Sequence, residues 1–188
     1  MIDGGPGLRV IAPGPSARAA FLDRDGVINV DRGFTVRPED LVFTPTAVAG
    51  IRLLNQAGYR VLVVSNQSGV ARGLFDTADV DAFHAHMQAA LQREGAHVDQ
   101  FYYCPYHEDG SVAEFAIQHE DRKPSPGMLL RGLRDWGIVR DGSFLIGDKQ
   151  SDLDAAARAG IPGILVPSND CDLAAVIGDA LTRRAQAA

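Results

Sequence analysis

The sequence predicts an α/β fold: a Rossmann-like, doubly wound and mostly parallel sheet of five or slightly more strands, with helices on both faces. Short apolar runs alternate along the chain with segments whose apolar residues recur every three or four positions. Such alternation is typical of parallel sheets, because each crossover between parallel strands needs a covering element. The 188 residues, 46% of them hydrophobic, are also enough for one well-buried core.

Five apolar runs bounded by turn residues are the expected strands. They comprise residues 19–23, 59–65, 100–104, 143–147 and 163–166. The first helix is expected over residues 47–58, and Thr77 is expected to cap the second. Pro126 would occupy the first position of the third helix, the fourth would end near Gly160, and the last would contain residues 173–181.

Composition limits where the protein works and what it binds. Residues 1–18 are rich in Gly and Pro and lack a signal-peptide core, so we expect a flexible N-terminal lead-in before a single domain over residues 19–188. No apolar run reaches the ~18 residues of a membrane span, and two cysteines do not make a disulfide framework. We therefore expect a cytoplasmic monomer. The net charge of −6 disfavours nucleic acid, and a phosphate substrate would need a metal ion or basic residues to reverse the local field.

Polar side chains follow three of the expected strands. The residues at these ends are Asp23 and Asp25, Ser65, and Asp148, and Lys123 precedes the third helix. Because the carboxyl ends of parallel strands meet at one edge of a sheet, we expect these side chains to lie close together. Asp148 is a hard oxygen ligand suited to Mg²⁺, the Ser65 hydroxyl suits phosphate oxygens, and Lys123 could neutralise a transferring phosphoryl group.

Each motif alone also fits an ordinary structural role. Asp-x-Asp-Gly and Ser-Asn-Gln-Ser-Gly are common turn sequences, and Ser151 or Asp152 could cap the helix after Asp148. A calcium-binding loop is excluded, because Phe34 stands where such a loop needs Glu. Neither cysteine is followed by the Arg that a cysteine phosphatase needs, and there is no GxxxxGKS or GxxxxGKT loop for ATP.

In combination, the motifs FLDRDG, SNQSG, RKP and GDKQSD resemble the haloacid dehalogenase (HAD) superfamily over about residues 19–167. The longer blocks FLDRDGVINVDRGF, SNQSGVARG and RKPSPGMLL are similar to its branch of heptose-bisphosphate and histidinol-phosphate phosphatases. The resemblance implies a HAD-like fold and a phosphomonoester hydrolase. The short span between Asp25 and Ser65 leaves no room for a large cap domain, so the substrate would meet an open site.

The resemblance implies a catalytic role for four residues. Asp23 would attack phosphorus and form an aspartyl phosphate, and Asp25 would act as general acid and then as general base. Ser65 would hold the phosphoryl oxygens, and Lys123 would stabilise the developing charge. Mg²⁺ would be bound by Asp23, the main-chain carbonyl of Asp25, and Asp148.

The family's substrate contacts fall on several loops of this chain. They are Asp31, Arg32, Phe34, Asn66, Gln67, Ser68, Arg122 and Lys149. Because Arg32, Arg72 and Arg122 supply more positive charge than one phosphate needs, the expected substrate is a heptose 1,7-bisphosphate that loses its 7-phosphate. Histidinol phosphate and other small sugar or polyol phosphates stay open. A non-catalytic binding module of the same fold is the alternative from a different class.

The resemblance is weaker before the RKP motif, where relatives carry a structural zinc site. Their Cys-x-His and Cys-x-Cys pairs correspond here to Cys104-Pro-Tyr106 and His119-Glu-Asp121. Tyrosine is not a usual zinc ligand, so we expect no bound zinc. A rearranged site of Cys104, His107, His119 and Asp121 is left open.

Overall fold

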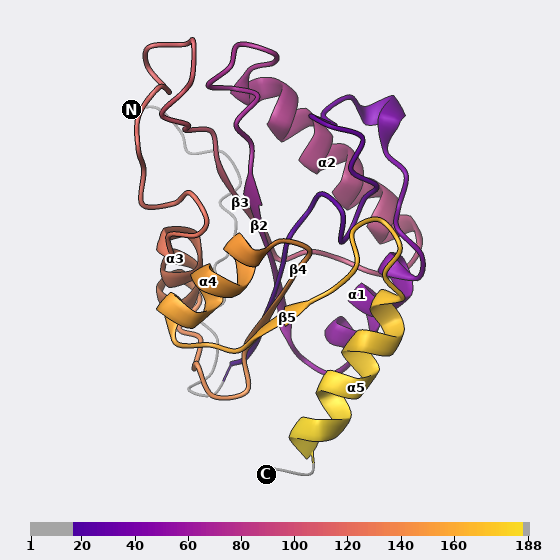
Figure 1. The fold of residues 1–188 in the computed structure, drawn as a ribbon. Coiled ribbons are helices and arrows are strands. Elements are labelled where there is room, and N and C mark those ends of the chain that lie inside the picture. Colours follow the sequence, from indigo (N-terminus) through magenta and orange to yellow (C-terminus); the bar gives the residue numbers. More distant parts are fainter. Residues whose placement is uncertain (1–16, 186–188) are drawn as a thin grey trace, which may run out of the picture.

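The computed structural model describes residues 17–185, so the expected lead-in, residues 1–18, lies outside the described residues except for Ala17 and Arg18. All five strands are parallel and lie in the order β3-β2-β1-β4-β5, which confirms the predicted doubly wound sheet (Figure 1). The strands are β1 Ala19–Leu22, β2 Arg60–Asn66, β3 Gln100–Cys104, β4 Phe144–Gly147 and β5 Gly163–Leu165. The strand order reverses next to β1, where open α/β sheets bind their ligands.

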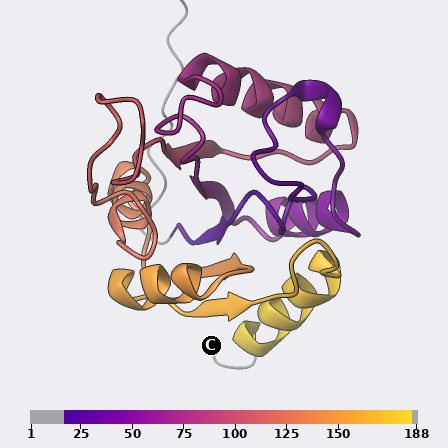
Figure 2. The same ribbon diagram turned by 45° about the horizontal axis from the view of Figure 1, so that its top comes forward.

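Helices cover both faces of the sheet, as predicted. They are α1 Ala47–Gln56, α2 Thr77–Arg93, α3 Gly127–Asp135, α4 Gln150–Ala159 and α5 Leu173–Ala185, with a short 3₁₀ helix, η1 Pro38–Asp40, before α1. One face carries α1, α2 and α5, and the other carries α3 and α4 (Figures 1 and 2). Between β1 and β2 the chain holds only η1 and α1, so no large cap domain is inserted there. No helix within residues 17–185 is long and apolar enough to cross a membrane.

The strands are apolar throughout because both faces of the sheet are covered. Ala20 and Leu22 of β1 pack in the core with α1, α2 and α5, while Ala19 and Phe21 pack in the core with α3 and α4. Successive side chains of a strand point to opposite faces, so each core receives alternate residues. All four side chains are fully buried, and the strand therefore appears in the sequence as a continuous apolar run.

Two helix starts differ from the prediction. Asp76, not Thr77, caps α2: its carboxylate accepts the backbone N–H of Asp79 at 2.9 Å, while the Asp79 carboxylate accepts that of Asp76 at 3.0 Å. This reciprocal pair satisfies two backbone donors at the helix start. Pro126 lies one residue before the first helical residue of α3, Gly127. Sequence pattern locates such boundaries only to within a residue or two, because capping residues are only half helical.

Candidate active site

The predicted catalytic residues gather at the carboxyl edge of the sheet, where β1, β2 and β4 end. The backbone N–H of Asp23 donates to the Ile146 carbonyl of β4 at 2.9 Å, which fixes the end of β1 against its neighbour. A small polar cavity of about 40 Å³ lies at this edge. Its lining residues are Asp23, Asp25, Ser65, Asn66, Lys123, Lys149, Ser151 and Asp152. All four residues predicted to be catalytic are among them, so the fold brings them together.

Lys123 is the buried cation of this cavity. Its Nζ lies 2.9 Å from Asp23 Oδ1 and 2.6 Å from Asp152 Oδ1. Nζ also donates to the main-chain carbonyl of Val64 at 2.8 Å. Burial alone would lower the pKa of Lys123, but the charges of the two carboxylates outweigh it and raise the pKa. Lys123 therefore stays a cation beside the predicted nucleophile.

Asp23 lies in a crowded, negatively charged environment. Burial raises the pKa of Asp23 to about 7, the charge of Lys123 opposes the rise, and the charges of Asp152 and Asp25 add to it. One ammonium group thus contacts two carboxylates, those of Asp23 and Asp152. A further cation at this place would favour the ionised form of Asp23, which is the nucleophilic one.

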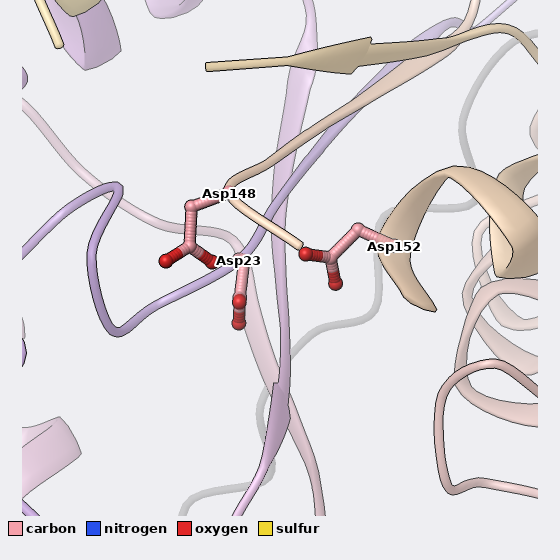
Figure 3. Close-up of side chains that lie close together, drawn as sticks. All are labelled: Asp23, Asp148 and Asp152. Carbon is pink, nitrogen blue, oxygen red and sulfur yellow. The ribbon is translucent and has the colours of Figure 1, made fainter. Parts of the chain in front are cut away.

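Asp23, Asp148 and Asp152 form a cluster that could hold a metal ion. Within residues 17–185 no other cluster of three or more Asp, Glu, His or Cys side chains could do so. A ligand atom of each lies within 4.8 Å of the others, and Figure 3 shows the three carboxylates together at the ends of β1 and β4 and the start of α4. Asp148 Oδ1 is buried and accepts no hydrogen bond, although buried polar atoms are nearly always paired. Carboxylate oxygens in this arrangement fit a hard cation such as Mg²⁺.

Asp152 is a site residue that sequence reasoning assigned only to a helix cap. The N-cap of α4 is Lys149, neither Ser151 nor Asp152; Asp152 lies three residues later, where its Oδ2 accepts the Lys149 N–H at 3.0 Å. Its Oδ1 lies 2.6 Å from Lys123 Nζ. The signal that could have found it is a second Asp four residues after Asp148, in the first turn of the following helix. Asp25, by contrast, contributes no carboxylate oxygen to the acidic group.

Two glycines allow these carboxylates to come so close to the backbone. Gly26 has a φ of +87°, and a side chain on it would collide with the Asp148 carboxylate and the Ser168 hydroxyl. A side chain on Gly147 would overlap the carboxylate of Asp152. Glycine is required at both places because the backbone passes directly against an acidic side chain.

Asp25 is fixed by hydrogen bonds from three side chains. Arg24 Nη2 donates to its Oδ2 at 2.9 Å, Asn29 Nδ2 donates to Oδ1 at 3.0 Å, and Gln67 Nε2 donates to Oδ2 at 2.8 Å. Burial acts to raise the pKa of Asp25, but the charge of Arg24 and these hydrogen bonds outweigh it and lower the pKa. Asp25 is therefore an ionised carboxylate in this arrangement.

Arg24 is a second residue that sequence reasoning missed. An arginine is expected at the surface of a protein, but Arg24 is fully buried and paired with Asp25. Its guanidinium lies 4.7 Å from the centroid of the Phe83 ring, donates to the Thr35 carbonyl at 2.7 Å, and meets His84 Nε2 at 3.2 Å. Burial, together with the Arg24 charge, lowers the pKa of His84 to about 3, so His84 is neutral and accepts this hydrogen bond. Arg24 thus ties Asp25 to the loop that contains Thr35.

The side chains at the end of β2 and directly after it hold their neighbours in place. Asn66 Nδ2 donates to the Lys123 carbonyl at 2.9 Å, and Asn66 Oδ1 accepts the Lys123 N–H at 3.1 Å, which fixes the segment that carries Lys123. Gln67 Nε2 donates to Ser65 Oγ at 2.7 Å as well as to Asp25. The side chains of Asn66 and Gln67, predicted to contact substrate, are thus engaged within the protein, whereas Ser68 is partly exposed.

The other predicted substrate residues lie on three loops: Asp31, Arg32 and Phe34 after β1, Arg122 before α3, and Lys149 between β4 and α4. Lys149 is 56% exposed, and its Nζ lies 3.6 Å from Asp31 Oδ2. Phe34 is 51% exposed, and Arg32 is exposed beside it. Arg122 lines a second, larger cavity of about 490 Å³ that is formed by the loops before α3.

The rearranged zinc site of Cys104, His107, His119 and Asp121 is not formed. The thiol of Cys104 is buried and donates to the Tyr106 carbonyl at 3.8 Å, and Asp121 forms an ion pair with an arginine of α3 at 3.0 Å. The His119 ring stacks on the Tyr106 ring with their centroids 4.3 Å apart. Aromatic stacking and an ion pair therefore hold side chains that were candidates for zinc.

Comparison with known proteins agrees with this geometry. A family model described as HAD-hydrolase-like matches residues 121–185. The D-glycero-beta-D-manno-heptose-1,7-bisphosphate 7-phosphatase of Rhodopseudomonas palustris is 44% identical over 162 residues, which are 86% of this chain and 90% of that protein. The protein of the same name from Yersinia pestis is 40% identical over 146 residues, which are 78% of each chain.

Solved structures show the same similarity. A protein from Mesorhizobium loti that is described as HAD-like has a TM-score of 0.83 at 36% identity, covering 98% of this chain and 91% of its own. The D,D-heptose 1,7-bisphosphate phosphatase from B. bronchiseptica, complexed with magnesium and phosphate, has a TM-score of 0.76 at 35% identity, covering 88% of this chain and 99% of its own. The chain therefore belongs to the HAD-like hydrolases, in the family of the D-glycero-D-manno-heptose-1,7-bisphosphate 7-phosphatases.

Proposed function

We propose that this protein is a magnesium-dependent phosphatase that removes the 7-phosphate of D-glycero-D-manno-heptose 1,7-bisphosphate through an aspartyl-phosphate intermediate. The observation that carries the proposal is the buried Asp23 carboxylate. One of its oxygens lies 2.9 Å from Lys123 Nζ, and a carboxylate oxygen of Asp148 lies within 4.8 Å of an Asp23 oxygen. The names of relatives at 40% and 44% identity support the choice of substrate.

Asp23 would be the nucleophile. In the first half-reaction, one of its carboxylate oxygens forms a bond to phosphorus while the bond from phosphorus to the O7 oxygen of the sugar breaks. Lys123 would compensate the charge on the phosphoryl oxygens, because its Nζ already lies beside Asp23. Ser65 Oγ accepts a hydrogen bond from Gln67, so its own proton is available for a phosphoryl oxygen.

Asp25 would transfer the protons of both half-reactions. Because Asp25 is ionised before the substrate binds, it would first take up a proton; it would then give this proton to the O7 leaving oxygen and become ionised again. In the second half-reaction, the ionised carboxylate would take a proton from the water that attacks phosphorus, and the bond from phosphorus to Asp23 breaks. The ionised Asp25, held by Arg24 and Gln67, is the form that this second step needs.

The donor set of this site fits Mg²⁺, because Asp148 Oδ1 is a buried carboxylate oxygen without a hydrogen-bond partner. Asp23, Asp148 and Asp152 would hold the ion together with the main-chain carbonyl of Asp25. Bound there, Mg²⁺ would supply the positive charge that lets a carboxylate approach a phosphate dianion. Support also comes from the B. bronchiseptica relative, whose structure is a complex with magnesium and phosphate.

A phosphate-release assay tests the proposal by comparing kcat/KM for heptose 1,7-bisphosphate, its two monophosphates and histidinol phosphate. We expect the bisphosphate to be preferred in Mg²⁺ and turnover to stop in EDTA. Asp23→Asn should lower kcat by about a thousandfold or more without unfolding the protein. Asp179→Asn, an exposed change on α5, is the matched control and should keep full activity.

Three results would contradict parts of the proposal. Preference for histidinol phosphate would reassign the substrate within the same chemistry. Turnover in EDTA would contradict the proposed need for a metal ion. Normal turnover by Asp23→Asn would contradict the proposed covalent intermediate.

A single domain over residues 19–188, a cytoplasmic location and a monomeric state stay predictions.

A further inference from the structure

The Arg24 side chain bends back onto the carboxylate that follows it in the chain. Its Nε donates to Asp25 Oδ1 at 3.1 Å, and its Nη2 lies 3.0 Å from Oδ1 and 2.9 Å from Oδ2. Asn29 and Gln67 each donate to one oxygen of Asp25, whereas Arg24 contacts both oxygens. Because a guanidinium is planar and rigid, the orientation of Arg24 governs the direction in which the Asp25 carboxylate faces.

Two consecutive residues of α2 hold this guanidinium in place. The Phe83 ring lies against it, with the ring centroid 4.7 Å from Arg24 Cζ, and His84 Nε2 lies 3.2 Å from Arg24 Nη1. The His84 ring is fixed in its turn, because it stacks on the Phe101 ring of β3 with the two centroids 4.5 Å apart. His84 therefore ties Nη1 of the guanidinium to a helix and a strand.

The contact with Arg24 requires one particular form of the His84 ring. A guanidinium only donates hydrogen bonds, so Nε2 is the acceptor and the ring proton lies on Nδ1. Burial and the charge of Arg24 lower the pKa of His84 to about 3, which keeps the ring neutral at neutral pH. His84 also lines a cavity of about 310 Å³ formed by α2 and residues 98–101, whereas Arg24 is fully buried. The ring therefore separates Arg24 from that cavity.

We propose that His84 is a positioning residue for the proton transfer at Asp25, an inference that rests on the proposed function. By accepting the hydrogen bond from Nη1, His84 keeps the Arg24 guanidinium in the orientation in which Nε and Nη2 hold the Asp25 carboxylate. A general acid must reach the leaving oxygen at hydrogen-bond distance, so a small displacement of its carboxylate slows the reaction. His84 acts on this step only through Arg24.

Removing the acceptor of His84 should slow the step that needs a proton from Asp25. His84→Phe keeps a ring that can stack on Phe101 and close off the cavity, but it accepts no hydrogen bond from Arg24. We expect it to lower kcat for heptose 1,7-bisphosphate about tenfold or more with little change in KM. His84→Leu also lacks an acceptor and should give the same loss. His84→Gln, whose carbonyl oxygen can accept, should recover most of it. His86→Phe, the same change at an exposed position of α2, is the matched control and should keep full activity.

The leaving group separates this role from a purely structural one. p-Nitrophenyl phosphate releases a stable anion that needs no proton, so a general acid contributes little to its cleavage. The value of kcat/KM covers only the steps up to release of this group, and it therefore excludes the second half-reaction. His84→Phe should lower kcat/KM for p-nitrophenyl phosphate less than about threefold, against about tenfold or more for the bisphosphate. Equal losses for the two esters would overturn the inference.

Nuclear magnetic resonance of isotope-labelled protein tests the contact without turnover. The unmodified protein should show the His84 ring proton on Nδ1 and slowly exchanging side-chain N–H groups of Arg24. His84→Phe should speed this exchange about tenfold or more. A ring proton on Nε2, or equally slow exchange in the variant, would overturn the inference. If the unmodified protein does not hydrolyse the bisphosphate, the proposed function fails, whereas these signals still show whether His84 holds Arg24.

Discussion

Replacing Lys123 by Met tests whether one buried cation holds the acidic residues of the site together. The change leaves the carboxylates of Asp23 and Asp152, which lie 2.9 and 2.6 Å from the ammonium group, without their cation. The Val64 carbonyl also loses its hydrogen-bond donor. Breaking a buried ion pair by removing one partner costs about 3–5 kcal/mol. Protonation of Asp23, whose pKa is already raised to about 7, limits this cost. We therefore expect the free energy of unfolding to fall by about 3 kcal/mol at neutral pH.

Urea unfolding in EDTA measures this loss without a metal ion to replace the missing charge. Lys149→Met is the matched control, because Lys149 is 56% exposed and its contact with Asp31 spans 3.6 Å, so its loss should stay below about 1 kcal/mol. Adding Asp152→Asn to Lys123→Met removes one of the two carboxylates that lack a cation, and it should restore part of the stability. A Lys123→Met protein as stable as the unmodified one in EDTA would refute the reasoning.

Three further predictions concern the surroundings of this cluster. Asp148→Asn should raise the Mg²⁺ concentration for half-maximal activity more than about tenfold, since Asp148 Oδ1 is the unpaired oxygen, and an unchanged Mg²⁺ titration would count against this. Gly26→Ala should lower the free energy of unfolding by about 1–3 kcal/mol in urea. Gly33 has a similar positive φ but no atom within 4 Å of an added side chain, so Gly33→Ala should lower the free energy of unfolding by less. Equal losses for the two variants would show that backbone strain, not the collision with Asp148, is responsible. Because burial and the Arg24 charge lower the pKa of His84 to about 3, the unfolded chain takes up a proton below pH 6.5 that the folded protein does not. Stability should fall by about 1.4 kcal/mol per pH unit from this source as the pH drops below 6.5, and pH curves of His84→Gln that run parallel to those of the unmodified protein would contradict it.

Apolar patterning and chain direction were sufficient to locate the edge at which the site forms. A strand covered on both faces is apolar throughout, so residues 19–23 could be recognised as a strand without any alternation. Chain direction then decides which end of the strand comes last. Because all five strands are parallel, Asp23, Ser65 and Asp148 had to reach the same edge. These inferences need only local composition and the order of elements.

Which polar groups meet and which remain unpaired depended on packing between distant segments. Whether Asp152 only caps α4 or also reaches Lys123 is set by how closely α4 docks against Gly147, and no local pattern encodes that distance. Arg72 and His107, 35 residues apart in the chain, meet because hydrogen bonds join the loops after β2 and β3. Loops lack the periodic side-chain pattern of helices and strands, so their contacts follow from backbone bonds that form only once the sheet has assembled.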